Sequence, residues 1–442
     1  MARRKPDRGT MLPFALYALP LGIAAYGGIN TLAARGPSLA LASTDKSDKG
    51  DKNAPATAAA AQPPHIPSSV FGDARFRDRI DWKAKKLAAD GSGFEVPLDD
   101  GQRAQLTLDP ALQARAEDLL ADSAAPYGAI VVMSTDGRVL ALATASVAEP
   151  ELPAGKLALE PWAPSASIFK LVTATALVDD GVVPETPVCY HGGLRSVEVD
   201  NLVDDGDRDG ACKDFAYGVA KSQNAIVAKL AATHLDAKKL ARAAAALGYG
   251  AAPDFALAAL PSTITVPDDK SERLEFARTA AGFWHSQLSP LGGALMAATI
   301  ANSGLMVTPR IVAGVIPAEG GEPLPVLPVA PRRALDPDTA DAVGEMMVKT
   351  TEMGTAYKAF HDPRGQRYLG TARVAGKTGS LSRDQPTYLN YSWFVGYAPA
   401  EAPRYVVSVL LGNSAMWKLK AHTIARLVLE TALAGGSDAG HE

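Results

Sequence analysis

Residues 128–143 read Gly-Ala-Ile-Val-Val-Met-Ser-Thr-Asp-Gly-Arg-Val-Leu-Ala-Leu-Ala, a pattern of strand, tight turn and second strand. Asp136-Gly137 between two apolar runs is a strong local signal for a β-hairpin. Three more strand patterns occur much later in the chain, near Val374, over Tyr391–Tyr397 and over Tyr405–Leu411. The sequence therefore predicts one antiparallel sheet of five strands, closed by pairing between segments that are distant in the chain.

Helices are predicted on both sides of this hairpin in the sequence. Leu108-Asp-Pro110 supplies an N-cap and a first-turn proline for an amphipathic helix that continues to about Ala121. A mostly helical insertion is predicted from Ser167 to Asn302, and a last amphipathic helix from Lys418 to Leu433. The predicted fold class is α+β: a five-stranded antiparallel sheet flanked by helices, with a large helical insertion.

Length and composition limit the function classes. The chain has 442 residues, of which 47% are hydrophobic and 21% charged, and its formal net charge is -4. This length is enough for one large domain or two ordinary ones. There is no excess of cations to neutralise a phosphate backbone, so no nucleic-acid partner is expected. The histidines are scattered without metal-ligand spacing, so no metal or other cofactor is expected either.

The N-terminal end predicts a membrane anchor ahead of the sheet. Cations within residues 1–8 precede a stretch from Gly9 to Ala34 that has no charged residue and is long enough to span a bilayer as a helix. The positive-inside bias then places the N-terminus in the cytoplasm and the body of the protein outside it. Cleavage as a signal peptide near Leu39-Ala-Leu-Ala42 is the competing interpretation. The body is exported in both cases.

Composition divides the rest of the chain into segments. After the basic end and anchor of residues 1–34, residues 35–69 are rich in Ser, Asp, Lys, Ala, Gly and Pro, which predicts a disordered tether. Residues 70–104 contain a few aromatic side chains, enough for a small satellite element that packs on the body. The folded domain is predicted over residues 105–434, and residues 435–442 form a flexible tail.

The first string with chemical meaning is Pro164-Ser-Ala-Ser167-Ile-Phe-Lys170, which opens the helical insertion. In a helix that begins near Ser167, Lys170 lies one turn later on the same face, so its amine can reach the serine hydroxyl. A serine needs a base to act as a nucleophile. A lysine whose pKa is lowered by a nearby cation or by the helix N-terminus can be that base. Ser-x-x-Lys is a common string and carries little weight alone.

Two further strings give it weight. Lys221-Ser222-Gln-Asn224 precedes an apolar helix and would, alone, be an ordinary helix cap. Val374-Ala-Gly-Lys377-Thr-Gly-Ser380 lies on a predicted strand, where glycines allow close backbone approach and a cation can recognise a carboxylate. The upstream glycine of a phosphate-binding loop is missing. Ser-x-x-Lys, Ser-x-Asn and Lys-Thr-Gly in this order are the set found in penicillin-binding proteins and serine β-lactamases.

Residues 105–434 accordingly resemble the transpeptidase domain of penicillin-binding proteins, and flanking strings such as Leu288-Ser-Pro-Leu291 and Trp393-Phe-Val-Gly-Tyr-Ala398 are similar as well. The resemblance implies a peptidoglycan D,D-transpeptidase that forms an acyl-enzyme from D-Ala-D-Ala stem peptides, transfers it to an amine and binds penicillin at the same site. The alternatives are a D,D-carboxypeptidase or β-lactamase, which transfer the acyl group to water, and a non-catalytic β-lactam sensor or division scaffold. No Glu-x-x-x-Asn string follows Ser222 to activate water as in a β-lactamase.

The resemblance also implies the partners and the cellular location of the protein. The expected partners are stem peptides, β-lactams, the membrane through the N-terminal helix, and other cell-wall synthesis proteins. The expected location is the bacterial inner membrane, crossed once, with the catalytic domain in the periplasm.

Three residues are implied to be catalytic. Ser167 would form the acyl-enzyme, Lys170 would accept its proton, and Ser222 would relay a proton to the departing D-Ala. Two positions depart from the family pattern: Ala166 stands where a glycine is usual before the nucleophile, and Ser380 stands where a threonine is usual after Lys-Thr-Gly. Both changes bear on the rate and on β-lactam affinity more than on the reaction class.

Five residues are implied to bind substrate. Asn224 would hold the substrate's amide, and Lys377 and Thr378 would bind its terminal carboxylate. The backbone amides of the nucleophile and of Ser380 would form the oxyanion hole, and Gly379 would leave room for that approach.

Cys189 and Cys212 are the only cysteines of the chain, and both lie in the helical insertion. An oxidising compartment favours a disulfide between them over two separate buried thiols. Asp205, Asp207 and Asp209 lie between the cysteines, in a string that resembles the start of a calcium loop. Ala216 stands where that loop would end in glutamate, so a solvated acidic loop is the favoured interpretation.

Overall fold

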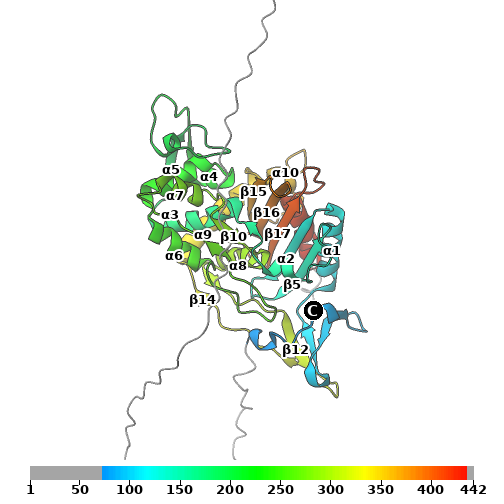
Figure 1. Cartoon of the computed structure of the whole chain (residues 1–442). Coiled ribbons are helices and arrows are strands. Elements are labelled where there is room, and N and C mark those ends of the chain that lie inside the picture. The colour runs from blue at the N-terminus through cyan, green and yellow to red at the C-terminus, as the bar shows by residue number, and fades with distance from the viewer. Residues whose placement is uncertain (1–71, 436–442) are drawn as a thin grey trace, which may run out of the picture. The chain divides into compact units, whose positions relative to one another are not determined.

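The computed structural model describes residues 72–435, so the predicted anchor and tether and residues 436–442 lie outside the described part. A five-stranded antiparallel sheet with the order β15-β16-β17-β4-β5 forms the centre of the molecule (Figure 1). The sheet predicted from the sequence is thereby confirmed. Its strands are β4 (Tyr127–Ser134), β5 (Val139–Ser146), β15 (Ala375–Arg383), β16 (Leu389–Ala398) and β17 (Tyr405–Asn413).

Strand β4 is an uninterrupted apolar run because helices cover both faces of the sheet. Ile130 and Val132 pack in one core cluster with α1 and α11, whereas Val131 packs in another with α8. Helix α1 begins as predicted, with Asp109 accepting a hydrogen bond from the backbone N–H of Leu112. The covering helices are α1 (Pro110–Ser123) and α11 (Ala421–Gly435) on one face, and α2 (Lys156–Leu159), α8 (Pro290–Ala301) and α9 (Pro337–Glu352) on the other.

The insertion after Ser167 forms a separate lobe beside the sheet, but it is less helical than predicted (Figure 1). Residues 180–214 and 247–272 form two long connections, because both stretches are rich in Gly, Pro and Asp, which favour turns. The first connection contains the hairpin of β7 (Pro187–Tyr190) and β8 (Ala211–Asp214). The helices of the lobe are α3 (Lys170–Asp179), α4 (Phe215–Ala220), α5 (Asn224–His234), α6 (Ala237–Ala246) and α7 (Arg273–Ala280).

A second, smaller sheet joins the N-terminal part of the described chain to residues beyond the lobe. Strand β3 (Arg103–Leu106) pairs with β12 (Val312–Ile316), so the predicted boundary after residue 104 falls within a strand. Asp73 is buried and accepts hydrogen bonds from the backbone N–H groups of Ile311 at 2.6 Å and Val312 at 3.1 Å. Burial raises the pKa of Asp73 to about 6. The other strands of this sheet are β1 (Lys86–Leu87), β2 (Phe94–Pro97) and β13 (Leu324–Pro325).

Short elements complete the described part: β6 (Ala163–Pro164), β9 (Thr263–Ile264), β10 (Ser286–Leu288), β11 (Leu305–Met306), β14 (Arg332–Arg333) and α10 (Tyr357–Phe360). Between residues 72 and 435, no helix has the length and apolar character needed to cross a membrane.

Candidate active site

Ser167 lies in a 3-10 turn (Ala166–Phe169) that leads directly into α3. Its neighbours from Ala163 to Lys170 are buried, and Ser167 alone among them is partly exposed, in a cleft. The Nζ atom of Lys170 lies 2.9 Å from Ser167 Oγ, as the helical spacing predicts. The hydroxyl is therefore accessible to a ligand and touches an amine.

Lys170 is fully buried and has no acidic partner within the described residues. Its Nζ donates to Asn224 Oδ1 at 2.7 Å and to the backbone carbonyl of Ala281, both of which are uncharged. Burial, followed by the charge of Lys377, lowers the pKa of Lys170 well below the usual lysine value. A neutral amine, able to accept a proton, is thus favoured beside Ser167 Oγ.

The connection between α4 and α5 contributes Ser222, and the start of α5 contributes Asn224. Asn224 is the first residue of α5, and its Nδ2 donates to the backbone carbonyl of Leu194 at 2.9 Å. Because its Oδ1 accepts from Lys170, the orientation of the Asn224 amide is fixed. Ser222 has a left-handed backbone with φ 55°, which turns its side chain toward the same cleft.

Strand β15 forms the opposite wall of the cleft. Lys377 is fully buried, and its Nζ donates to Ser222 Oγ at 3.1 Å and to the backbone carbonyl of Thr378 at 2.8 Å. Burial lowers the pKa of Lys377 to about 7. Gly379 packs against the nucleophile turn so closely that an added Cβ would lie 3.2 Å from Ile168. A side chain at 379 would therefore require its neighbours to shift by a few tenths of an ångström.

These segments enclose one cleft of about 840 Å³. Eight residues singled out from the sequence meet there, six of them lining the space and two lysines lying beneath it: Ser167, Ser222, Asn224, Thr378, Gly379 and Ser380, with Lys170 and Lys377. They come from three segments that are far apart in the chain. The family model for the penicillin-binding protein transpeptidase domain matches residues 128–430.

The chain belongs to the penicillin-binding protein transpeptidase family. It is 25% identical to penicillin-binding protein PbpB of Mycolicibacterium smegmatis over 336 residues, which cover 71% of this chain and 50% of PbpB. It is 31% identical over 162 residues to peptidoglycan D,D-transpeptidase PbpA of Mycobacterium tuberculosis, covering 36% of this chain and 32% of PbpA. The matches thus span half or less of the length of these two relatives.

Solved structures of this family have the same fold. The D,D-transpeptidase domain of a peptidoglycan glycosyltransferase from Eggerthella lenta superposes with a TM-score of 0.62 at 26% identity, covering 80% of this chain and 95% of that domain. Penicillin-binding protein A of M. tuberculosis, solved as a ceftriaxone acyl-enzyme complex, gives 0.60 at 23% identity, covering 75% of this chain and 80% of that one. At 23% identity, the similarity to penicillin-binding protein A supports the fold only.

The departure from the family pattern at Ala166 has a structural correlate in this transpeptidase domain. Ala166 adopts a left-handed backbone with φ 50°, a conformation that costs a residue with a Cβ about 1–2 kcal/mol and glycine almost nothing. Ala166 is buried against β15, so packing holds the strained turn in place.

Several site residues escaped the sequence analysis. The carbonyls of Leu194 and Ala281 orient Asn224 and Lys170, and backbone groups leave no mark in side-chain patterns. Thr355, whose hydroxyl hydrogen-bonds to that of Thr378, was not among the predicted site residues. His422 lines the cleft, and burial, then the charge of Lys420, lowers its pKa to about 4.

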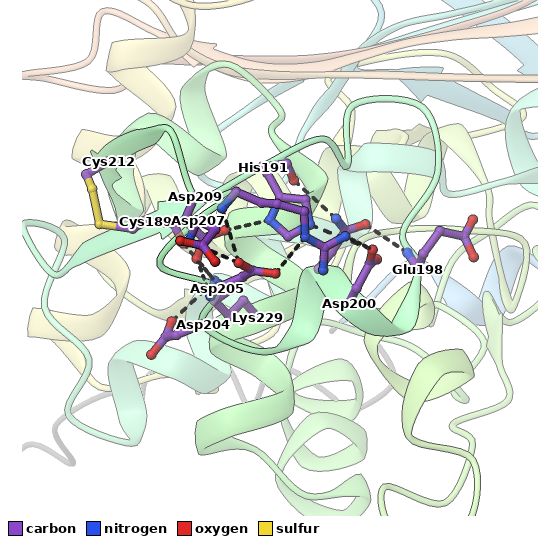
Figure 2. A network of polar contacts seen from close by, with 12 residues as sticks. Cys189, His191, Glu198, Asp200, Asp204, Asp205, Asp207, Asp209, Cys212 and Lys229 are labelled. Carbon is purple, nitrogen blue, oxygen red and sulfur yellow. Dashed lines mark hydrogen bonds and ion pairs between the residues drawn. A yellow bond between two sulfur atoms is a disulfide. The ribbon is translucent and has the colours of Figure 1, made fainter.

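The predicted cysteine pair lies at the base of the loop between β7 and β8, where Cys189 and Cys212 form a disulfide (Figure 2). Two of the three carboxylates of the suspected calcium loop are engaged by cationic side chains: Asp205 pairs with Arg208, and Asp209 pairs with Lys229 at 2.9 Å. Hydrogen bonds from His191 and Lys229 lower the pKa of Asp209. These contacts favour the acidic-loop interpretation over calcium.

Proposed function

We propose that this chain is a peptidoglycan D,D-transpeptidase in which Ser167 is acylated by D-Ala-D-Ala stem peptides. One observation carries the proposal: Lys170 Nζ lies 2.9 Å from Ser167 Oγ and is fully buried with only uncharged partners. A lysine in these surroundings is a general base for a serine nucleophile. Membership of the transpeptidase family supports the substrate class.

The acylation step assigns a role to each catalytic group. Lys170 takes the proton of Ser167 while Oγ bonds to the carbonyl carbon of the penultimate D-Ala. The backbone N–H groups of Ser167 and Ser380 stabilise the oxyanion, which typically lowers such a barrier by about 3 kcal/mol. When the C–N bond breaks, Ser222 passes the proton from Lys170 to the departing D-Ala amine. Lys170 is then neutral again.

The binding groups orient the donor peptide for this attack. Lys377 and Thr378 take the terminal carboxylate, and the ammonium of Lys377 polarises Ser222, which lies 3.1 Å away. Asn224 takes an amide of the peptide on the other side of the scissile bond. Penicillin carries a carboxylate and a reactive amide carbonyl and would acylate Ser167 in the same way.

The second half of the reaction decides between the alternatives. In transpeptidation an acceptor amine attacks the ester carbonyl, loses a proton through Lys170, and releases Ser167 with its proton restored. A β-lactamase that uses a glutamate to activate water would need a carboxylate in the cleft, and none of the cleft-lining residues is Asp or Glu. This composition argues against a β-lactamase of that kind. Lys170 can act as the base for an amine and for water alike, and membership of the transpeptidase family favours the amine. A carboxypeptidase, a β-lactamase and a non-catalytic sensor become outcomes of the test.

The cellular setting is part of the proposal. An anchor in residues 9–34 and the tether of residues 35–69 would hold the catalytic domain outside the cytoplasm, within reach of peptidoglycan and of other wall-synthesis proteins. The disulfide of the described part supports an oxidising compartment.

The test uses the full chain, fluorescent penicillin, and a pentapeptide ending in D-Ala-D-Ala with and without glycinamide as the amine. We expect a single penicillin adduct, and D-Ala release that increases with amine and yields the new amide. D-Ala release that does not change when the amine is added would identify a carboxypeptidase. Rapid hydrolysis of the penicillin adduct would identify a β-lactamase. A stable adduct with no product from the peptide would identify a sensor.

The pH dependence of penicillin acylation follows from the two buried lysines. The reaction needs a neutral Lys170, whose lowered pKa sets the acid limb, and a charged Lys377, whose pKa of about 7 sets the alkaline limb. Lys170 loses its proton first because burial, and then the charge of Lys377, lowers its pKa. We expect a bell-shaped plot of the second-order rate constant against pH. A rate that keeps rising well above neutral pH would contradict the assignment of Lys377.

A further inference from the structure

The charged side chains that line the cleft are all cationic or titrate as cations. The cations that line it are Arg195, Lys221 and Lys420, and no carboxylate is present among the lining residues. His422 also lines the cleft, but its pKa of about 4 leaves it neutral near neutral pH. None of these three cations forms an ion pair with another described residue, although the Nζ atom of Lys420 lies 4.7 Å from the centroid of the Trp417 ring. A cleft of this kind attracts a ligand with more negative charge than the single terminal carboxylate that Lys377 and Thr378 would bind.

Arg195 differs from the other two cations in the way its backbone is held. The backbone carbonyl of the preceding residue, Leu194, accepts the hydrogen bond from Asn224 Nδ2 at 2.9 Å. Arg195 therefore follows directly in the chain on a residue bonded to Asn224, which would hold the substrate's amide. Gly193 lies so close to α5 that an added Cβ would be 2.4 Å from the Cβ of Ala225. The loop is therefore in direct contact with the first turn of the helix that carries Asn224.

The rest of the loop is fastened at several points (Figure 2). The disulfide closes its base, and Lys229, buried on α5, donates to the carbonyl of Cys189 at 2.7 Å and to Asp209 at 2.9 Å. Asp209 also bonds to Nδ1 of His191 at 2.6 Å. These contacts order a loop whose Gly- and Asp-rich sequence would otherwise be mobile, and they fix the position of the Arg195 backbone at the mouth of the cleft.

The far side of the loop is tied to the lobe as well. Arg278 on α7 donates to the carbonyl of Val197 at 2.8 Å and pairs with Glu198 at 3.1 Å. Glu198, the acidic residue of the loop that is nearest in sequence to Arg195, is therefore already paired with Arg278. The guanidinium of Arg195 is left without a carboxylate from the described residues and is exposed beside the cleft.

We propose that Arg195 is a specificity residue that binds a second free carboxylate of the donor peptide, located on the N-terminal side of its D-Ala-D-Ala terminus. This inference rests on the proposed function. With the terminal carboxylate at Thr378 and the scissile carbonyl at Ser167, the remainder of the peptide passes Asn224 and leaves the cleft beside Leu194 and Arg195. A guanidinium can bind a carboxylate there with two parallel hydrogen bonds. Lys221 and Lys420 add to the attraction of an anionic donor.

The test compares two donors that differ in one group. Both are acetyl-γ-D-glutamyl-(Nε-acetyl)-L-lysyl-D-alanyl-D-alanine; one has a free α-carboxylate on the glutamyl residue and the other a carboxamide. We measure kcat/KM for D-Ala release by the full chain and, because turnover can be slow, the protection that each peptide gives Ser167 against penicillin. We expect the carboxylate donor to be preferred about tenfold, and the preference to fall as salt is raised.

Variants assign the preference to one side chain. Arg195→Gln should bring the ratio of the two donors close to one by slowing only the carboxylate donor, and Arg195→Lys should retain part of it. Arg242→Gln is the matched control, because Arg242 is an exposed arginine on α6 outside the cleft. This control should keep the parent ratio.

The inference and the proposed function fail in different ways. Equal ratios in the parent and in Arg195→Gln, with normal penicillin labelling of Ser167, would overturn the role of Arg195 and leave the transpeptidase proposal standing. Absence of penicillin labelling in the parent would overturn both.

Discussion

Ser167→Ala is expected to abolish the covalent penicillin adduct entirely. Ser167 is partly exposed at the cleft, and the Nζ atom of Lys170 lies 2.9 Å from its Oγ. Without Oγ there is no atom to form the acyl bond, whereas Lys170 keeps its contacts with Asn224 and the carbonyl of Ala281. The fold should therefore survive. The measurement is in-gel fluorescence of the labelled full chain, with mass spectrometry of the modified peptide.

Ser165→Ala is the matched control for this experiment. Ser165 lies two residues earlier in the same Ser-Ala-Ser string, but it is buried and bonds to the hydroxyl of Tyr249 at 2.8 Å. Its loss should cost about 1 kcal/mol of stability and leave the adduct in place. An adduct that persists in Ser167→Ala, or disappears only in Ser165→Ala, would refute the assignment of the nucleophile.

Lys170→Met should lower the rate of penicillin acylation by about 10²- to 10⁴-fold, the usual contribution of a general base. Methionine preserves most of the buried volume and removes the amine that takes the proton of Ser167. Stopped-flow measurement of acylation separates the chemical step from noncovalent binding, and we expect binding to change little. The acid limb of the pH profile should also disappear, because the group that produces it is gone.

Lys349→Met tests whether any lysine-to-methionine change would have this effect. Lys349 is half-buried on α9 and does not line the cleft, so its replacement should leave the acylation rate within a few-fold of the parent. The thermal unfolding midpoints of both variants show whether the fold is intact. An acylation rate for Lys170→Met within tenfold of the parent would mean that another group is the base.

The central sheet could be predicted from the sequence because its signals are local. The apolar runs of β4 and β5 flank Asp136-Gly137, and Asp109 and Pro110 mark the start of α1. The catalytic strings could be located for a different reason: each carries little weight alone, but the three in this order are typical of one family.

The rest of the site depends on tertiary contacts that no local pattern encodes. The carbonyl of Ala281 reaches Lys170 only because α7 packs beside α3 and α5. The proximity of Arg195 to the cleft depends on a loop fastened by Asp209 and Lys229, whose sequence instead resembled a calcium site. The left-handed backbone of Ala166 is likewise imposed by packing, since its sequence would favour an ordinary helical conformation.

Pairing between β4 and β17 joins Tyr127 to Gly412, almost the full length of the domain apart. The edge of β4 that β17 covers therefore stays unpaired until almost the whole domain is available to fold. A polypeptide truncated before β17 would lack this partner strand, and we expect it to be inert and exposed to proteolysis.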